Sequence, residues 1–451
     1  MFRSASAFNK LLCGDAWVGS AATRTEMFTN SGGGTITPEP CCAAGQYHNS
    51  SQNWACLPCT AGSFQDQTGQ ASCTVCAAGT GGREGSASCG LFTPNNRTEL
   101  KTAVTACLGE DDTGDCTEHQ KTHGKIGGWN TSKVTNMNRM FQGAWGFDQD
   151  LSAWDVGKVT DMNNMFYEAK KFKGNISMWD VSQVTDMSFM FQGAKGDDGS
   201  IFNGNLSAWD VSKVKDMSDM FKRAIKFNQD LSAWDVGQVT NMKDMFYRAY
   251  VFNSDLSAWD VGQVMNMEDM FEKAYVFNSD LSAWDVSQVT NMVEMFSEAK
   301  AFNGDISAWN MGNVSDMSGM FEKTTFTRVI IPDSVTELGK NAFQNCTALT
   351  TVVIGSGVHK IEDDAFNGCT HLEAIVIASS NTISIGNNII WDVNSDVKII
   401  KTGDYTGKLN TNATNELNII PHKKYYNTNE CICKTNNYIC NHVKQQYMSS
   451  C

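Results

Sequence analysis

The chain has 451 residues, of which 41% are hydrophobic, and its formal net charge is -14 at pH 7. This length suffices for several domains with buried cores, whereas the acidic balance argues against nucleic acid or an anionic membrane surface as a partner, because both attract Lys and Arg patches. No apolar run reaches the roughly 18–20 residues of a transmembrane helix, so we expect no membrane span in this chain.

The first residues lack the continuous apolar stretch of a secretory signal peptide, and we expect residues 1–40 to form a poorly ordered segment. The cysteines nevertheless indicate an oxidising location, since ten of the 16 precede residue 117 and four follow residue 430. Gly-rich segments with many cysteines bury little apolar surface and usually depend on disulfides. We therefore expect an extracellular or cell-surface protein without a recognisable signal peptide. Glycosylation sequons are compatible with this location, although several stand where other repeats carry Asp: Asn49, Asn96, Asn130, Asn175, Asn205, Asn313, Asn345 and Asn412.

Residues 41–90 are predicted to form a small cysteine-rich disulfide module. Its segments begin C-x-x-G, as in CTAGSF, and it resembles the cysteine-rich repeats of ephrin-receptor-like and tumour-necrosis-factor-receptor-like ectodomains. The repeated long gap favours sequential bridges, although the sequence does not settle the pairing: Cys42–Cys56, Cys59–Cys73 and Cys76–Cys89. A zinc ribbon is the alternative for C-x2-C pairs, but no His stands at ligand spacing, and the Gly, Ser and Thr content favours disulfides.

Residues 91–125 are predicted to form a helical N-terminal cap and linker that shields the core of the first repeat. Cys107 and Cys116 are placed to close a small loop before the repeats. His119 and His123 have the spacing of a metal-binding pair on a helix, but Gln120 replaces the Glu of H-E-x-x-H. We therefore expect a solvated pair of histidines and no metal.

Residues 126–323 contain eight repeats of about 25 residues, the signature of a stacked array. Trp recurs at 129, 154, 179, 209, 234, 259, 284 and 309, and one longer step follows an insertion around GDDGS at 196–200. In one unit, Leu231, Trp234 and Val236 predict a short strand. The apolar residues from Val239 to Phe252 then predict a helical or 3-10 stripe facing the same side. One unit cannot offset its own conformational entropy, so the units are expected to stack.

The shared core is predicted to consist of ladders of Trp, Met and Phe. Met packs irregular interiors well and contacts aromatic rings, which explains the repeated Met pairs better than a copper site does. The predicted core residues are Trp154, Trp179, Trp209, Trp234, Trp259, Trp284, Phe166, Phe191, Phe221, Phe246, Phe271 and Phe296.

Residues 324–400 are predicted to form leucine-rich repeats with a shorter period. Val329, Val352 and Ile375 are 23 residues apart, as are Cys346 and Cys369. The unit LTTVVIGSGVHKIEDDAFNGC gives a strand, a tight turn and a short segment ending in A-F-x-x-C. Residues 401–451 form a tail whose four cysteines either pair in disulfides or belong to a loosely ordered end.

Both kinds of repeat resemble those of one family. LSAWDVSQVTNMVEMFSEAKAFNGD is similar to the W-D-V-S-x-V-T-x-M-x-x-M-F repeats of BspA-type surface proteins, and the A-F-x-x-C units are similar to that family's 23-residue leucine-rich repeats. The resemblance covers about residues 126–390. It implies an α/β solenoid, a leucine-rich-repeat-like right-handed array of short parallel strands and short helical or 3-10 segments. It also implies surface display or secretion and adhesion to, or recognition of, a protein or glycan ligand.

The resemblance supplies no catalytic residues, and no catalytic motif is present, so we expect no enzyme and no cofactor. The positions flanking Trp hardly vary between units, whereas KRAIK, YRAYV and SEAKA show variation after Met-Phe. Three explanations of this uniform face remain. It has a structural role, it is matched to a repetitive partner such as a glycan or mineral, or it results from recent duplication of the repeat. Two alternatives to adhesion remain at this stage, a structural or Ca²⁺-binding matrix component and the ectodomain of a signalling receptor complex.

The candidate binding face is a file of aspartates that follow the tryptophans. Either each Asp accepts hydrogen bonds from turn N–H groups, or the file forms a row of weak Ca²⁺ sites. The file consists of Asp155, Asp180, Asp210, Asp235, Asp260 and Asp285. A second file, of asparagines, is predicted to bond the backbone of neighbouring turns: Asn203, Asn228, Asn253, Asn278 and Asn303.

Overall fold

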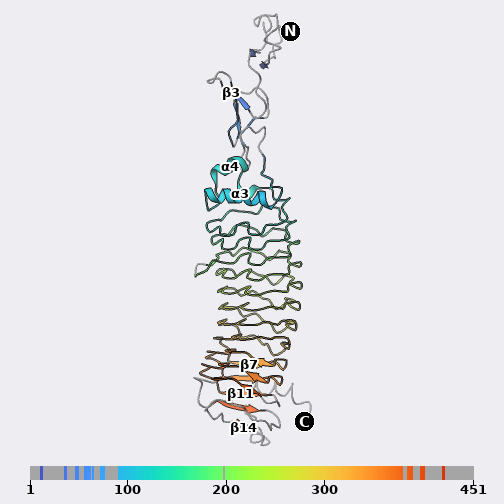
Figure 1. Ribbon diagram of the computed structural model, residues 1–451, viewed down its shortest axis with the longest axis vertical. Helices are drawn as coiled ribbons and strands as arrows, with labels where there is room; N and C mark the ends of the chain where they lie inside the picture. Colours follow the sequence, from blue (N-terminus) through green and yellow to red (C-terminus); the bar gives the residue numbers. More distant parts are fainter. Residues whose placement is uncertain are drawn as a thin grey trace. The chain divides into compact units, whose positions relative to one another are not determined.

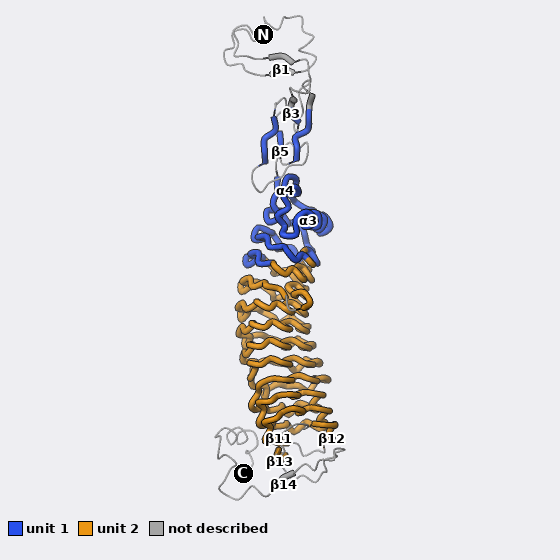
Figure 2. Tube along the Cα trace, turned by 90° about the vertical axis from the view of Figure 1, so that its left-hand side faces the viewer, with its two compact units in different colours: residues 1–140, 144–159, 172–179 blue, residues 141–143, 160–171, 180–451 orange. Residues whose placement is uncertain are grey.

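The computed structural model describes residues 11–13, 35–37, 46–49, 55–61, 63–65, 72–76, 90–196, 199–378, 383–389, 397–401 and 419–421. It divides into two compact units (Figure 2): residues 1–140, 144–159 and 172–179 form the first, and residues 141–143, 160–171 and 180–451 form the second. The segment 1–40 and the tail 401–451, whose order was in question, lie outside the described residues except for β1 (Leu11–Cys13), β2 (Thr35–Thr37), the end of β13 (Lys398–Lys401) and β14 (Ile419–Pro421).

The cysteine-rich part of the first unit contains two small antiparallel sheets. β3 (Gln46–Asn49) pairs with β4 (Ala55–Pro58), and β5 (Ser63–Phe64) pairs with β6 (Thr74–Val75). A disulfide joins Cys59 to Cys73, and Cys76 is also disulfide-bonded. The bridges expected at Cys42–Cys56 and Cys76–Cys89 involve side chains outside the described set.

Helix α3 (Arg97–Glu110) begins at Asn96, whose Oδ1 accepts a hydrogen bond from the Glu99 N–H at 3.0 Å. Asn is a favoured residue at this position because its side chain pairs an N–H that the helix leaves free. A disulfide between Cys107 and Cys116 connects α3 to α4 (Thr117–His123), and the 3-10 turn η2 (Ile126–Gly128) leads into the first coil. Of the helices described, none is long and apolar enough to cross a membrane.

Each 25-residue coil is made of consecutive tight turns, and the strand predicted at Leu231–Val236 is wrong. The Trp234 N–H donates to the Leu231 carbonyl at 3.1 Å, and the Val239 N–H donates to the Val236 carbonyl at 2.9 Å. The predicted helical stripe after Val239 is likewise a series of turns. The inward side chains keep the predicted phase, because Leu231, Trp234 and Val236 are at most 3% exposed.

The hydrogen bonds between backbone groups of successive coils lie after the predicted strand rather than in it. In the second unit, the Asp244 N–H donates to the Glu268 carbonyl at 2.8 Å, and the Phe246 N–H donates to the Met270 carbonyl at 2.9 Å. Isolated parallel bridges occur in the same stretch, for example between Asn241 and Asn266. In this series of inter-coil hydrogen bonds, the backbone N–H groups of one coil pair with the carbonyls of the next.

Two cations of α3 complete the hydrogen bonding of the first coil. Arg97 donates from Nε and Nη2 to the Asn138 carbonyl at 3.1 and 2.7 Å. Lys101 Nζ donates to the carbonyls of Arg139 and Met140 at 2.8 Å each. In later coils, the carbonyls equivalent to those of Asn138 and Met140 accept N–H groups from the preceding coil. The helix therefore caps the array by supplying the donors that a preceding coil would supply.

The core of the second unit is one continuous stack of aromatic rings. Trp234 and Trp259 lie parallel with ring centroids 6.5 Å apart, and Phe246 stacks on Phe221 and Phe271 at 5.6 Å each. All twelve predicted Trp and Phe core residues are at most 4% exposed. Burial of each such side chain contributes roughly 1.5–3 kcal/mol, so stacking holds the coils together. In Figure 1 the coils between residues 200 and 320 follow one another in the order of the sequence.

The 23-residue repeats of the second unit form two parallel sheets (Figure 1). The larger has the order β14-β13-β11-β9-β7, where β7 is Arg328–Ile331, β9 is Thr351–Ile354 and β11 is Ala374–Ile377. The smaller contains β8 (Glu337–Leu338), β10 (Lys360–Ile361) and β12 (Ser384–Ile385). Here the predicted strand positions are correct, and Val352 lies opposite Val329 and Ile375.

The asparagine file forms the predicted ladder between coils. Asn253 Oδ1 accepts a hydrogen bond from the Asn278 N–H at 2.9 Å, and Asn228 Oδ1 accepts one from the Asn253 N–H at 2.8 Å. In the first unit, Asp148 has the equivalent role, since its Oδ1 accepts the Lys173 N–H at 2.7 Å. The ladder requires a side-chain acceptor and not specifically an amide.

We expect Asn253→Ala to lower the free energy of unfolding by about 1 kcal/mol, because the Asn278 N–H loses its acceptor. Asn253→Asp retains an acceptor oxygen, as Asp148 does, and should cost less. Urea unfolding followed by circular dichroism measures both changes. Equal stability of the Ala and Asp variants would contradict a contribution from the ladder.

Candidate functional site

The aspartates of the predicted binding face are exposed, and each is held by its own turn. In the second unit, Asp235 Oδ1 accepts the Gly237 N–H at 3.1 Å, and Asp260 Oδ1 accepts the Gly262 N–H at 3.0 Å. Of the two interpretations of the file, the structure shows the hydrogen bonds to turn N–H groups. The bonds fix the direction of every carboxylate and repeat it from coil to coil.

Where Ser stands two residues after the Asp, its hydroxyl adds to this arrangement. Ser212 Oγ donates to Asp210 Oδ1 at 2.6 Å, and its N–H donates to the same oxygen at 3.1 Å. These bonds hold the pKa of the Asp210 carboxyl below its usual range, and those from Ser287 do the same for Asp285. The carboxylates are therefore charged at neutral pH.

The sequence analysis missed a second exposed file of aspartates, which lie four residues before Trp234, Trp259, Trp284 and Trp309. Asp230 Oδ1 accepts the Ser232 N–H at 2.9 Å, and the Ser232 hydroxyl and N–H lower the pKa of Asp230. Its signal in the sequence is the recurrent F-N-x-D-L-S motif. We call the two files of the second unit the acidic face, which comprises Asp210, Asp235, Asp260 and Asp285 together with Asp230, Asp255, Asp280 and Asp305.

The variable residues after Met-Phe form a surface of a different kind, which we call the basic–aromatic edge and define as residues 222–226, 247–251 and 272–276 with Lys300. Tyr250 and Tyr275 stack with centroids 5.0 Å apart, and Lys300 Nζ lies 4.8 Å from the centre of the Tyr275 ring. Arg248 lies 5.3 Å from the centre of the Tyr247 ring. Such cation–π contacts hold long side chains in a fixed arrangement.

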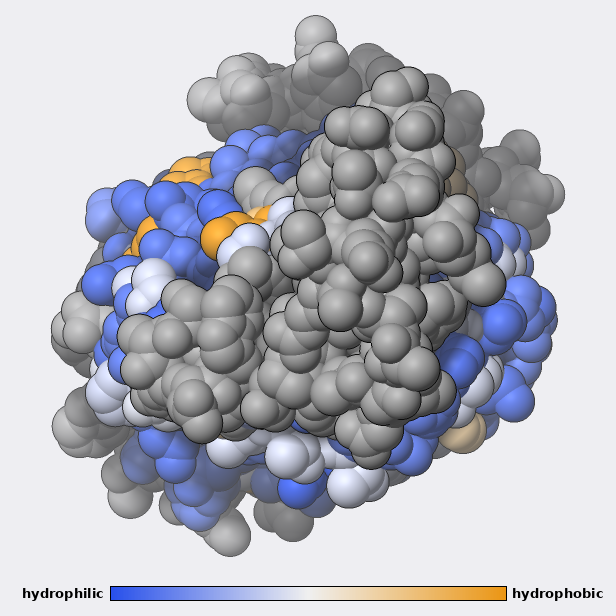
Figure 3. Space-filling view, turned by 90° about the horizontal axis from the view of Figure 1, so that it is seen from above, coloured by the Kyte–Doolittle hydropathy of each residue, from blue (hydrophilic) through white to orange (hydrophobic). Residues whose placement is uncertain are grey.

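The edge also exposes apolar side chains. Among the large apolar residues described in the second unit, the exposed ones are Val251, Met265 and Val276, at 37%, 52% and 44%. Two of the three therefore belong to the edge. In the first unit, the exposed large apolar residues among those described are Val75, Leu91, Trp145 and Met178, at 78%, 54%, 56% and 81%. On the face seen in Figure 3, small hydrophobic patches lie among hydrophilic residues.

The cations of the edge divide into two sets. Lys222 is paired inward, with Asp219 and Asp244 at 2.9 Å each, and Lys273 is paired with Glu272. The second set forms no ion pair with any residue that the structure describes: Arg223, Lys226, Arg248 and Lys300. These four side chains give the edge a positive charge in a chain whose net charge is -14.

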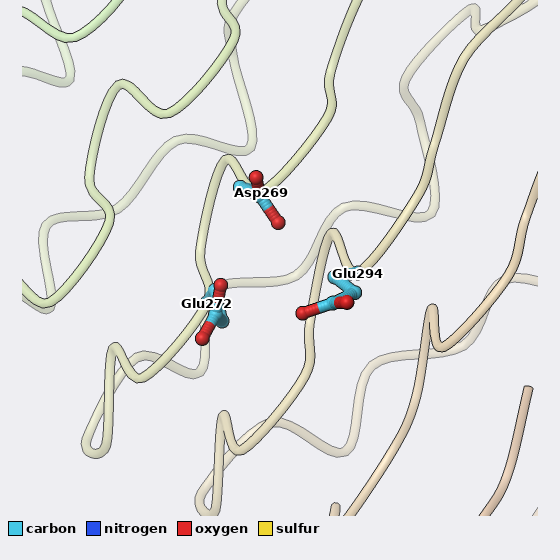
Figure 4. Close-up of side chains that lie close together, drawn as sticks. All are labelled: Asp269, Glu272 and Glu294. Atoms are coloured by element: carbon cyan, nitrogen blue, oxygen red, sulfur yellow. The ribbon is translucent and has the colours of Figure 1, made fainter. Parts of the chain in front are cut away.

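Three carboxyl groups, one of which belongs to the edge, come close together (Figure 4). Oxygen atoms of Asp269, Glu272 and Glu294 all lie within 4.8 Å of one another. Burial, followed by the carboxylates of Asp244, Glu272 and Glu294, raises the pKa of Asp269 to about 8. Oxygen ligands of this kind suit Ca²⁺, but a proton on Asp269 and the ammonium of Lys273 already reduce the negative charge.

The position of Asp269 explains why its charge is not compensated. It belongs to a file ten residues after each Trp, in which Asp219, Asp244 and Asp269 all have positive φ. Lys222 pairs with the first two of these carboxylates. The equivalent residue one coil later is Tyr247, so no cation reaches Asp269 from that position.

The two histidines of α4 are packed together and remain partly exposed. The rings of His119 and His123 stack with centroids 4.1 Å apart, and Phe92 and Trp129 lie against them. Burial lowers the pKa of His119. The aromatic surface of Trp129 at the start of the array accounts for this packing.

Two solved structures of leucine-rich repeat proteins are similar to part of this chain. A leucine-rich repeat protein from Bacteroides ovatus is 13% identical over 59% of this chain and 66% of its own length, with a TM-score of 0.25. A leucine-rich cell surface protein from Faecalibacterium prausnitzii is 15% identical over 60% of this chain and 65% of its own length, with a TM-score of 0.27. The matches thus span slightly less than two thirds of those chains. No curated protein matches the sequence.

The repeats themselves identify the family. Residues 317–432 match the model described as BspA type leucine rich repeat region. Residues 117–201, 197–279 and 252–353, together more than half of the chain, match the model described as Mycoplasma protein of unknown function, DUF285. The chain therefore belongs to the DUF285 family of repeat proteins, and its later repeats are leucine-rich repeats of the BspA type.

Proposed function

We propose that the chain is a non-enzymatic recognition protein, secreted or displayed at a cell surface, which acts in adhesion by binding a protein partner through its basic–aromatic edge. The observation that carries this proposal is the concentration of variable, partly exposed Tyr, Arg and Val side chains on one edge of an otherwise uniform array. The disulfides Cys59–Cys73 and Cys107–Cys116 support an oxidising, extracellular location.

A surface that recognises a protein combines side chains of several kinds. The edge has this property, because the equivalent segments read KRAIK, YRAYV and EKAYV and thus join Tyr, Val and cations, while S-A-W-D-V recurs beside the acidic face. Tyr and Arg are also among the residues enriched at protein interfaces and at their hot spots. The buried Trp and Phe stacks keep these side chains on a rigid support, which limits the entropy lost on binding.

We expect the variant Tyr250→Ala/Tyr275→Ala/Arg248→Ala to bind cells of the source organism at least about tenfold more weakly than the unchanged chain, since hot-spot residues contribute about 2 kcal/mol or more. Fluorescent beads coated with purified chain and counted by flow cytometry measure this binding. Gln238→Ala/Gln263→Ala is the matched control, because these exposed residues lie in the same coils but outside the edge. Unchanged binding by the triple variant, with a native circular dichroism spectrum, would refute the proposal.

A further inference from the structure

We infer that the protein partner of the basic–aromatic edge is a second copy of this chain, which presents its acidic face. This inference rests on the proposed recognition role of the edge. The adhesion would then be homophilic, between copies on neighbouring surfaces or side by side on one surface. Charge, spacing and shape each support it.

The first argument is charge. The edge presents four cations without an ion pair to any described residue, among them the exposed Lys226 and Lys300. The acidic face presents one or two aspartates per coil, and hydrogen bonds from Ser side chains and turn N–H groups keep Asp210, Asp230 and Asp255 ionised. Complementary potentials of this kind steer association and fix its register.

The second argument is spacing. Arg223 and Arg248 lie one coil apart on the edge, and Asp235 and Asp260 lie one coil apart on the acidic face. Because the same coil repeat generates both surfaces, their steps along the array are equal. A contact made by one coil can therefore recur at the next, and such linked weak contacts multiply in strength. An unrelated acidic protein has no such matched repeat.

The third argument is shape. Between its two files of aspartates, the acidic face exposes only small side chains, Ser and Ala, in each coil. Ala233 and Ala258 are exposed there. The larger side chains of the edge are available for contact with these alanines, since Tyr250 and Tyr275 are partly exposed and Val251 and Val276 are exposed. The pairing thus covers apolar surface that a single copy leaves in water.

The two surfaces differ, so the contact is heterologous. Such contacts produce rings if the rotation between copies closes and open assemblies if it does not. Sedimentation velocity of the purified full chain should therefore show species that grow with protein concentration and shrink as salt screens the charges.

Two variants test the pairing directly. Lys226→Glu/Arg248→Glu alters the edge, and replacement of Asp210, Asp235, Asp260 and Asp285 by Asn removes charge from the face. Asn keeps the turn, because Asn310 Oδ1 accepts the Gly312 N–H at 3.2 Å in the same way. Each variant alone should associate at least about tenfold more weakly than the unchanged chain, as expected for the loss of desolvated charge pairs. An equimolar mixture should form dimers, because one intact edge meets one intact face.

The other outcomes overturn the inference. A face variant that associates as strongly as the unchanged chain would indicate edge-to-edge contact, and a chain that stays monomeric at low ionic strength would exclude a second copy. If the monomeric chain instead binds poly-L-glutamate and the edge variant does not, the partner is a different acidic protein. In that case, loss of cell binding by the triple edge variant would still support the proposed function. Lys226→Gln/Arg248→Gln repeats the test without charge reversal.

Discussion

Replacement of Trp259 by Ala should lower the free energy of unfolding by about 3–5 kcal/mol, the usual cost of truncating a buried aromatic side chain. Trp259 is 3% exposed and stacks on Trp234, and its indole N–H donates to the Leu231 carbonyl in the preceding coil at 3.0 Å. The substitution therefore leaves a cavity and also removes the donor of a buried hydrogen bond.

Two companion variants separate these causes. Trp259→Phe retains an aromatic ring but loses the indole donor, so it should cost less than the Ala variant. Gln263→Ala changes an exposed residue of the same coil and should alter stability by less than about 0.5 kcal/mol. Urea unfolding monitored by circular dichroism gives the values. If Trp259→Ala matches Gln263→Ala, the stacked core does not hold these coils together.

Replacement of Asp269 by Asn should make the stability of the protein less sensitive to a rise in pH from 3.8 to about 8. The pKa of Asp269 is about 8 in the folded chain, and the ordinary value is 3.8. Between pH 3.8 and about 8, Asp269 therefore holds a proton in the folded state and has released it in the unfolded state. Its stabilising effect is fully present below pH 3.8 and is lost as pH rises through about 8.

The free energy of unfolding of the unchanged chain should therefore decrease between pH 5 and 9 more steeply than that of Asp269→Asn. The difference is at most about 1.4 kcal/mol per pH unit and is reduced by solvent because the carboxyl is only partly buried. Asp255→Asn is the matched control, since the pKa of this exposed carboxyl is lowered and it stays charged over the whole range. Parallel slopes for the unchanged chain and Asp269→Asn would contradict the buried proton.

The repeat phase of the large apolar residues is sufficient to predict the core. Trp234, Met245 and Phe246 recur every 25 residues, and side chains at equivalent positions of stacked coils must meet. The asparagine ladder is predictable for the same reason, because Asn253 and Asn278 occupy equivalent positions and each has an acceptor that reaches one coil away.

The location of the inter-coil ladder was not predictable from the same pattern. Alternation over Leu231, Trp234 and Val236 is typical of a short strand, but two tight turns place these side chains inward equally well. Such a short run does not distinguish the two conformations. In the 23-residue repeats, Thr351–Ile354 contains β-branched residues at every position, and there the predicted strand is present.

The functional surfaces were predictable only in part. The aspartates after Trp form a motif, so their file was recognised, whereas Tyr250 and Tyr275 belong to segments that differ between coils and form no motif. The charge state of Asp269 depends on Asp244 and Glu294 in neighbouring coils. Prediction of such a charge state requires the distances between groups that are about 25 residues apart in the sequence.

Successive coils are joined by the same hydrogen bonds, and a helix supplies donors only at the first coil. The gene can therefore gain or lose whole repeats. Unequal recombination that adds or deletes one 25-residue unit creates the same junction that it removes, so the open reading frame continues to encode a foldable product. The length of the array can then differ among related proteins by whole coils, while all of them keep the terminal helix and its two cations.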